Sequence, residues 1–101
     1  MKKKELKAAA LQYDRKVSSA PRVTAKGKGK TAQKIIEIAK ENNLPIRKDE
    51  DLVELLSKVE LDKEVPENLY KAVAEVFTFV YKMTNKHSKI VIDDEPKKSK
   101  Q

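Results

Sequence analysis

The run Gly29-Lys30-Thr31 ends like the phosphate-binding P-loop of nucleotide-binding proteins. The full pattern needs another glycine five residues before Gly29, and Thr24 stands at that position. The backbone cradle for a phosphate is therefore incomplete. Gly27 and Gly29, placed before a helix, could still hold an anion through free amides and the helix dipole. The interpretation we favour is a structural turn between a strand and a helix, with solvated lysines around it.

Residues suited to catalysis or metal binding are scarce elsewhere in the chain. His87 is the single histidine and there is no cysteine, which excludes thiolate metal sites, disulfides and cysteine nucleophiles. No base is evident beside the serines at positions 18, 19, 57, 88 and 99. The carboxylates are spaced as helix caps and exposed faces, not as a general acid–base pair in a pocket. We therefore expect no enzyme, no cofactor and no metal site.

Charge is unevenly distributed along the 101 residues, whose net charge is +7. Residues 2–34 hold eleven Lys or Arg against two acidic residues, whereas residues 35–101 hold twelve basic and fourteen acidic residues. Such a basic half is typical of proteins that bind nucleic acid, anionic membranes or acidic proteins. Between Arg15 and Lys34 there is no aromatic residue, which argues against base stacking on nucleic acid but leaves phosphate-only binding open.

The sequence also bounds the size and location of the protein. The length suits one domain with a small core. No apolar run approaches the ~18 residues of a membrane span, and the first five residues lack the apolar stretch of a signal peptide. We expect a soluble, cytoplasmic protein.

Apolar periodicity predicts an α/β domain with about three short strands. These are expected at residues 7–13, 22–25 and 44–47, although the alanines of the first segment also suit a short helix. Pro45 should keep the third strand near a sheet edge. Between the second and third strands, a helix ending near Asn42-Asn43 predicts a parallel crossover. Its inward-facing residues are Ala32, Ile35, Ile36 and Ala39.

Two further helices complete the expected domain. Asp49 or Asp51 can cap the first, and the second runs from Pro66 to about Met83. The inward-facing residues of the first are Leu52, Val53, Leu55, Leu56 and Val59. The second carries two apolar stripes about 100° apart. The core stripe is Leu69, Val73, Val76 and Val80, and the second stripe is Tyr70, Ala74, Phe77 and Tyr81. One broad stripe covers a sheet, so the second is either further core or a surface that meets something else.

The chain becomes mostly charged from Asn85 onward. Ile90, Val91 and Ile92 could add a small strand, but we expect a flexible charged tail over residues 85–101. The expected organisation is a basic N-terminal extension at residues 1–6 and a domain at residues 7–84. That domain is a small mixed sheet of about three short strands surrounded by three helices, and the tail follows it.

Several short motifs occur in order and with almost no gaps. They are AAALQYD at residues 8–14, SAPRV at 19–23, AKGKG at 25–29, IIEIA at 35–39, LPI at 44–46, VP at 65–66 and LYKAVAEV at 69–76. Together they resemble the cytoplasmic C-terminal domain of the FlhB/YscU family, the substrate-specificity switch of flagellar and type III export machines. The resemblance covers residues 7–83. It implies an α/β domain with a small sheet surrounded by helices.

The chain also departs from the pattern of the family it resembles. In the family an Asn-Pro-Thr-His motif precedes the first strand, and its asparagine cyclises and splits the chain. Lys3, Lys4, Glu5 and Leu6 stand there, so self-cleavage is chemically excluded. The strand before that motif is missing as well, so we expect an open sheet edge that a strand peptide from a full-length homologue fills. A Pro-Pro pair common before the third helix is replaced by Glu50-Asp51.

The resemblance implies that export substrates dock on a hydrophobic patch. Carried over by position, the patch consists of Ala20, Pro21, Ala74 and Phe77, which Tyr70 and Tyr81 extend. The partners it implies are export substrates and membrane export-gate proteins, including a full-length FlhB-type homologue. The function expected is a cytoplasmic protein-binding domain at the export gate that substitutes for the C-terminal fragment of full-length FlhB. The alternative is a small basic α/β module that binds RNA or anionic surfaces.

Overall fold

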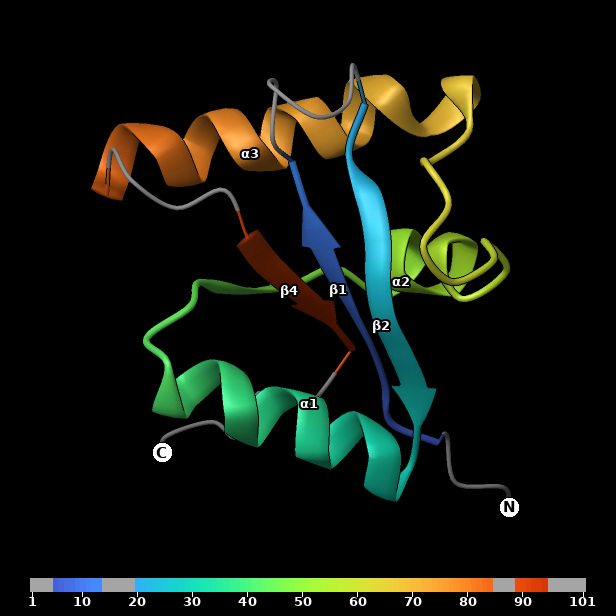
Figure 1. The fold of residues 1–101 in the computed structure, drawn as a ribbon, viewed down its shortest axis with the longest axis vertical. Coiled ribbons are helices and arrows are strands. Elements are labelled where there is room, and N and C mark those ends of the chain that lie inside the picture. The colour runs from blue at the N-terminus through green and yellow to red at the C-terminus, as the bar shows by residue number, and fades with distance from the viewer. Residues whose placement is uncertain (1–4, 14–19, 85–88, 95–101) are drawn as a thin grey trace.

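The computed structural model describes residues 5–13, 20–84 and 89–94, with the backbone alone for residues 79–84 (Figure 1). The strands are β1 (Lys7–Gln12), β2 (Arg22–Lys28), β3 (Ile46–Lys48) and β4 (Lys89–Asp93). The helices are α1 (Lys30–Glu41), α2 (Glu50–Leu56) and α3 (Tyr70–Thr84), and a 3-10 turn, η1 (Glu67–Leu69), leads into α3. The expected mixed α/β fold is confirmed, with one strand more than expected.

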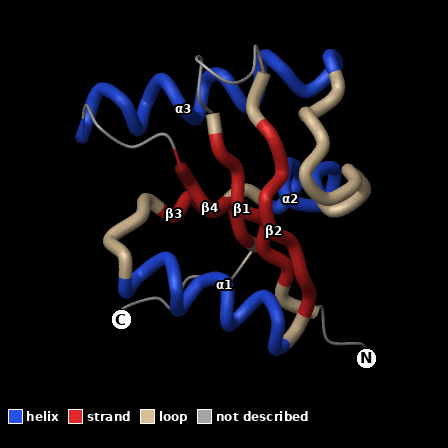
Figure 2. The backbone as a smooth tube through the Cα atoms, viewed as in Figure 1, coloured by secondary structure: helices blue, strands red, loops and turns tan. Residues whose placement is uncertain are grey.

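The four strands form one sheet in the order β2-β1-β4-β3 (Figure 2). β1 pairs antiparallel with both β2 and β4, and β3 pairs parallel with β4. β2 and β3 therefore run in the same direction, and the connection through α1 is the expected parallel crossover. It passes over β1 and β4, and it leaves β3 at an edge, as Pro45 predicts.

β4 corrects the expectation of a flexible tail starting at residue 85. Its residues Ile90, Val91 and Ile92 are each at most 1% exposed, and they lie in the middle of the sheet. A strand covered on both faces shows a continuous apolar run rather than alternation, and a run of three residues among charges is too short to identify it.

The same strand corrects the expectation of an open edge beside β1. Lys89–Asp93 occupies that edge, so β1 has a paired strand on each side. A peptide offered to the intact chain would therefore meet an edge that is already filled.

Helices cover both faces of the sheet (Figures 1 and 2). α1 packs on one face through the α1-side cluster, which is Ala8, Ala32, Ile36, Ala39 and Val91. α2 and α3 pack on the other through the α3-side cluster: Ala9, Leu11, Val23, Leu52, Val53, Leu56, Val65, Leu69, Val73, Val76, Phe77, Ile90 and Ile92. The alternation of strand side chains places neighbouring residues of β1 and β4 in different clusters.

The helix ends follow the sequence signals closely. Asn43 adopts the left-handed conformation (φ 57°) just after α1, as expected for this closing position. The Asp49 side chain accepts the Leu52 N–H at 3.0 Å and caps α2. Pro66 remains extended (ψ 156°), so the last helix begins one 3-10 turn later than expected.

Candidate protein-binding surface

The two stripes of α3 have different environments. On the core stripe, Leu69, Val73 and Val76 are buried, as expected. On the second stripe Tyr70 is 39% exposed and Ala74 is exposed, whereas Phe77 is 8% exposed and belongs to the α3-side cluster. The second stripe is therefore partly core and partly surface. The side chains of Val80 and Tyr81 lie outside the described part of the structure.

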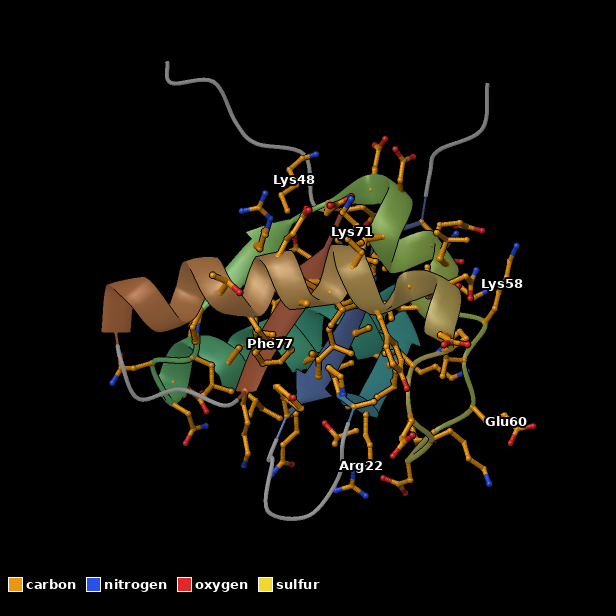
Figure 3. The ribbon with its side chains drawn as sticks, turned by 90° about the horizontal axis from the view of Figure 1, so that it is seen from above. Arg22, Lys48, Lys58, Glu60, Lys71 and Phe77 are labelled. Carbon is orange, nitrogen blue, oxygen red and sulfur yellow. The ribbon has the colours of Figure 1, made fainter. Side chains whose placement is uncertain are left out.

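Phe77 is held by an aromatic contact that the sequence did not suggest. Its ring meets the Tyr13 ring edge to face, with centroids 5.8 Å apart and an interplanar angle of 63°. Tyr13 directly follows β1, so the contact joins the end of that strand to the middle of α3. Figure 3 shows Phe77 beneath α3, on its sheet side. The only sequence signal was an aromatic residue at the end of a predicted strand.

Ala20 and Pro21 are both buried, just before β2 begins. The Pro21 carbonyl accepts the Val65 N–H at 2.9 Å. Two further backbone bonds attach β2 to the same connecting segment, Val23 N–H to the Lys63 carbonyl at 3.0 Å and Asp62 N–H to the Val23 carbonyl at 2.7 Å. The entry to β2 is thus fixed from its outer side by the chain that leads into η1.

The elements that carry the expected patch residues lie at one end of the sheet. α3 crosses the end where β1 finishes and β2 starts (Figures 1 and 2). Of its described members, Ala74 and Tyr70 face solvent, while Ala20, Pro21 and Phe77 lie beneath the surface.

A second apolar surface was missed from the sequence. It is an open groove of about 400 Å³ lined by Leu55, Lys58, Val59, Glu60, Lys63, Pro66, Asn68 and Leu69. Leu55, expected to face inward, is 44% exposed. α2 has only seven residues, and its buried positions are Leu52, Val53 and Leu56, so Leu55 points away from the sheet.

The two glycines have different structural roles: Gly29 allows a turn, and Gly27 allows a close contact with Thr31. Gly29 has φ 57° and ψ −124°, the angles of a type II′ turn position that favours glycine, and its N–H donates to the Leu6 carbonyl at 2.8 Å. A Cβ at Gly27 would lie 2.2 Å from the Thr31 Cγ2. These features support the structural turn that we favoured over a phosphate site.

Two lysines of the basic half are engaged within the fold. The Lys26 ammonium donates to the carbonyls of Ser57 and Val59 at 3.0 and 2.7 Å, where α2 ends. Lys7 forms an ion pair with Glu54. The Lys7 charge is thus paired with a carboxylate and the Lys26 ammonium is held by the backbone after α2, so both are less available to a polyanion.

The described ranges contain no cluster suited to a metal ion and no helix suited to crossing a membrane. They hold no group of three His, Cys, Asp or Glu side chains that could bind a metal ion. None of the helices within them combines the length and the apolar character needed to cross a bilayer.

The family of this chain follows from its similarity to known proteins. Residues 7–80 match the model of the FlhB HrpN YscU SpaS family. The chain belongs to this family. The match covers β1 through most of α3 and ends before β4. The resemblance expected from the sequence motifs is thereby confirmed.

Two relatives illustrate the extent of the FlhB/YscU match. The chain is 49% identical over 77 residues to the uncharacterized protein YlqH of Bacillus subtilis, a match that covers 76% of this chain and 83% of YlqH. It is 47% identical over 74 residues to the flagellar biosynthetic protein FlhB of Aquifex aeolicus. That match covers 72% of this chain and 21% of FlhB, so the chain spans about a fifth of that relative.

A solved structure agrees with both fold and family. The crystal structure of the cytoplasmic domain of FlhB from Shewanella putrefaciens matches this chain with a TM-score of 0.74 at 35% identity. The match covers 89% of this chain and 73% of that chain. The protein thus has the fold of the cytoplasmic domain of FlhB.

Proposed function

We propose that this FlhB/YscU-type domain is a soluble, cytoplasmic protein-binding module of a flagellar or type III export apparatus. It binds export substrates and membrane export-gate proteins, and it substitutes at the gate for the C-terminal fragment of a full-length FlhB. It does not cleave itself, since the residues at the cleavage position, Lys3 to Leu6, include no asparagine that could cyclise.

The observation that carries this proposal is the mixed character of the second stripe of α3. Ala74 and Tyr70 are exposed apolar side chains on one helical face, and Phe77 supports that face from the core. The Pro21 carbonyl is bonded to Val65, so the neighbouring entry to β2 is formed before any partner arrives. A preformed surface loses little conformational entropy on binding.

A matched pair of variants on α3 tests the substrate surface. Ala74 and Ala72 are both exposed alanines in the same helix, and they lie about 200° apart around its axis. We expect Ala74→Asp to weaken binding of a purified early flagellar substrate at least tenfold, and Ala72→Asp to change it less than twofold. Titration with the substrate measures the affinity of each variant, and circular dichroism checks that each variant is folded. Equal losses, or no loss for Ala74→Asp, would refute the surface.

Substitution at the gate needs a cellular test. In a strain whose FlhB is truncated before its C-terminal fragment, expression of this chain should restore secretion of early substrates. The Ala74→Asp chain, expressed at the same level, should not. Restoration by neither chain would refute the substitution role and leave substrate binding as a separate question.

The second candidate function is binding of RNA or an anionic surface by the basic half. It rests on exposed Lys28, Lys30 and Lys34 around the start of α1. Lys7 and Lys26 are already engaged with Glu54 and with backbone carbonyls, so fewer cations face a polyanion than the sequence suggests. We expect weak RNA binding that is lost near ~0.2 M salt, because the release of counterions from the phosphates becomes less favourable as the salt concentration rises. Submicromolar affinity at physiological salt would favour this candidate.

A further inference from the structure

β4 is an unusual component of this sheet because of its place in the chain. It is the last described element, yet it lies between β1 and β3 at the centre of the sheet. Five of its residues pair with β1, from Ala8 opposite Asp93 to Gln12 opposite Lys89. It lies outside residues 7–80, which match the family model.

β4 also connects the two halves of the core. Ile90 and Ile92 belong to the α3-side cluster, and Val91 belongs to the α1-side cluster. All three side chains are at most 1% exposed. Without them, the space between β1 and β3 would be a groove with apolar walls on both faces and unpaired backbone groups along its length.

Polar contacts hold the end of β4 in place. The Asp94 carboxylate accepts the Lys7 N–H at 2.7 Å, and the Asp94 N–H donates to the Lys7 carbonyl at 3.2 Å. The Asp93 carbonyl accepts the N–H of Asp49, the residue that caps α2. This position in the sheet thus holds three consecutive buried β-branched aliphatic residues followed by two buried aspartates, and the Asp94 side chain accepts a backbone N–H.

β3 depends on β4 for its place in the sheet. It has three residues, and β4 is its strand partner, with Val91 N–H also bonded to the Pro45 carbonyl. β1, in contrast, is also paired with β2. Departure of β4 would therefore free β3 but keep the β1–β2 pair.

We propose that the gap between β1 and β3 is a strand-binding site that this chain fills with its own residues 89–94. β4 acts as an internal competitor. The partner strand that can replace it is an extended segment of the same chemistry, β-branched aliphatic residues ending in an acidic pair, running antiparallel to β1. This inference is independent of the proposed substrate surface on α3.

The test uses the full chain and a synthetic peptide with the sequence of residues 88–95, labelled with a fluorophore. Ile92→Ala weakens the internal strand, so the peptide should bind this variant at least tenfold more tightly than it binds the unmodified chain. It should also raise the melting temperature of the variant by several degrees. A peptide of the same composition in scrambled order is the control. Ala74→Asp, on the α3 surface, should leave peptide binding unchanged.

Three outcomes would overturn the inference. The first is equal, weak binding of the peptide to a folded Ile92→Ala chain and to the unmodified chain. The second is a variant that dimerises instead of binding peptide, because a second copy would then be the occupant. If Ile92→Ala does not fold alone, the milder variant Ile92→Val is used as well. The third outcome is that the peptide neither refolds Ile92→Ala nor stabilises Ile92→Val.

Discussion

Tyr13 and Phe77 meet edge to face with their ring centroids 5.8 Å apart, although one follows the first strand and the other lies in the last helix. The contact fixes α3 over the end of β1. It gives Phe77 a structural role, since this residue is 8% exposed and belongs to the main core cluster. Variants of Phe77 therefore test the stability of the domain before they test any binding surface.

Phe77→Ala should lower the free energy of unfolding by about 3 kcal/mol, because it removes a buried ring and leaves a cavity. The contact with Tyr13 should account for about 1 kcal/mol of this loss. Chemical denaturation of Phe77→Ala, Tyr13→Ala and the double variant measures the coupling between the two rings. Strict additivity of the two losses would contradict a direct energetic contact.

Neighbouring positions on α3 should respond in opposite ways to the same charge. Val73 is fully buried and Ala74 is exposed. Val73→Asp should unfold the domain, since an unpaired carboxylate in the core costs more than the domain's marginal stability can offset. Ala74→Asp should keep a melting temperature close to that of the unmodified chain. Thermal melting of the two variants, followed by circular dichroism, tests this difference. Similar melting temperatures would show that the assignment of helix faces is wrong.

The two glycines before α1 should be intolerant of alanine for different reasons. Gly29→Ala places a Cβ on a residue with φ 57° and should cost about 1–3 kcal/mol of stability. Gly27→Ala introduces a Cβ 2.2 Å from the Thr31 Cγ2 and 2.7 Å from its Cβ. Adding Thr31→Ala should recover part of the Gly27→Ala loss and none of the Gly29→Ala loss. Rescue of both, measured by urea denaturation, would argue against this distinction.

Lys26 should stabilise the fold through hydrogen bonds, whereas Lys28 should not. Lys26→Met keeps the length of the side chain but leaves the Ser57 and Val59 carbonyls without their ammonium donor. We expect a loss of about 1–3 kcal/mol, the cost of unsatisfied polar groups. Lys28→Met, at an exposed position two residues later, is the control and should change stability by less than ~0.5 kcal/mol. Equal effects in thermal melts would remove the structural role of Lys26.

The purified chain should remain one species of 11.5 kDa at neutral pH. Cleavage by cyclisation requires an asparagine side chain, and Lys3, Lys4, Glu5 and Leu6 stand where the family motif would be. Intact-mass spectrometry over several days checks this. Appearance of a discrete fragment that begins near Lys4 would contradict it.

The elements that the sequence predicted correctly are those with strong local signals. Asn43 closes α1, Asp49 caps α2 and Pro45 precedes an edge strand, each through the backbone preference or hydrogen bond of that residue. The features that it missed depend on contacts between distant segments. Ile90 to Ile92 form a central strand by pairing with both β1 and β3, and Leu55 is exposed because α2 turns Leu52, Val53 and Leu56 toward the core.

The candidate surface was only partly predictable for the same reason. Periodicity placed Ala74 and Phe77 on one stripe, but periodicity does not say how far a helix tilts into the core. The ring of Tyr13 packs against Phe77, and this residue is buried. Local patterns therefore identified the helix face, and long-range packing decided which of its residues face solvent.

The central position of β4 has a consequence for the rate and order of folding. The Lys7 N–H and the Asp94 carboxylate that it meets are 87 residues apart in sequence. On the ribosome, β4 emerges after the other strands that the structure describes, so the nascent chain holds β1, β2 and α1 before this sheet can close. Contacts of such long range slow folding because the chain loses loop entropy before they form. Folding of this domain should accordingly finish in a late, slow step in which β4 enters between β1 and β3.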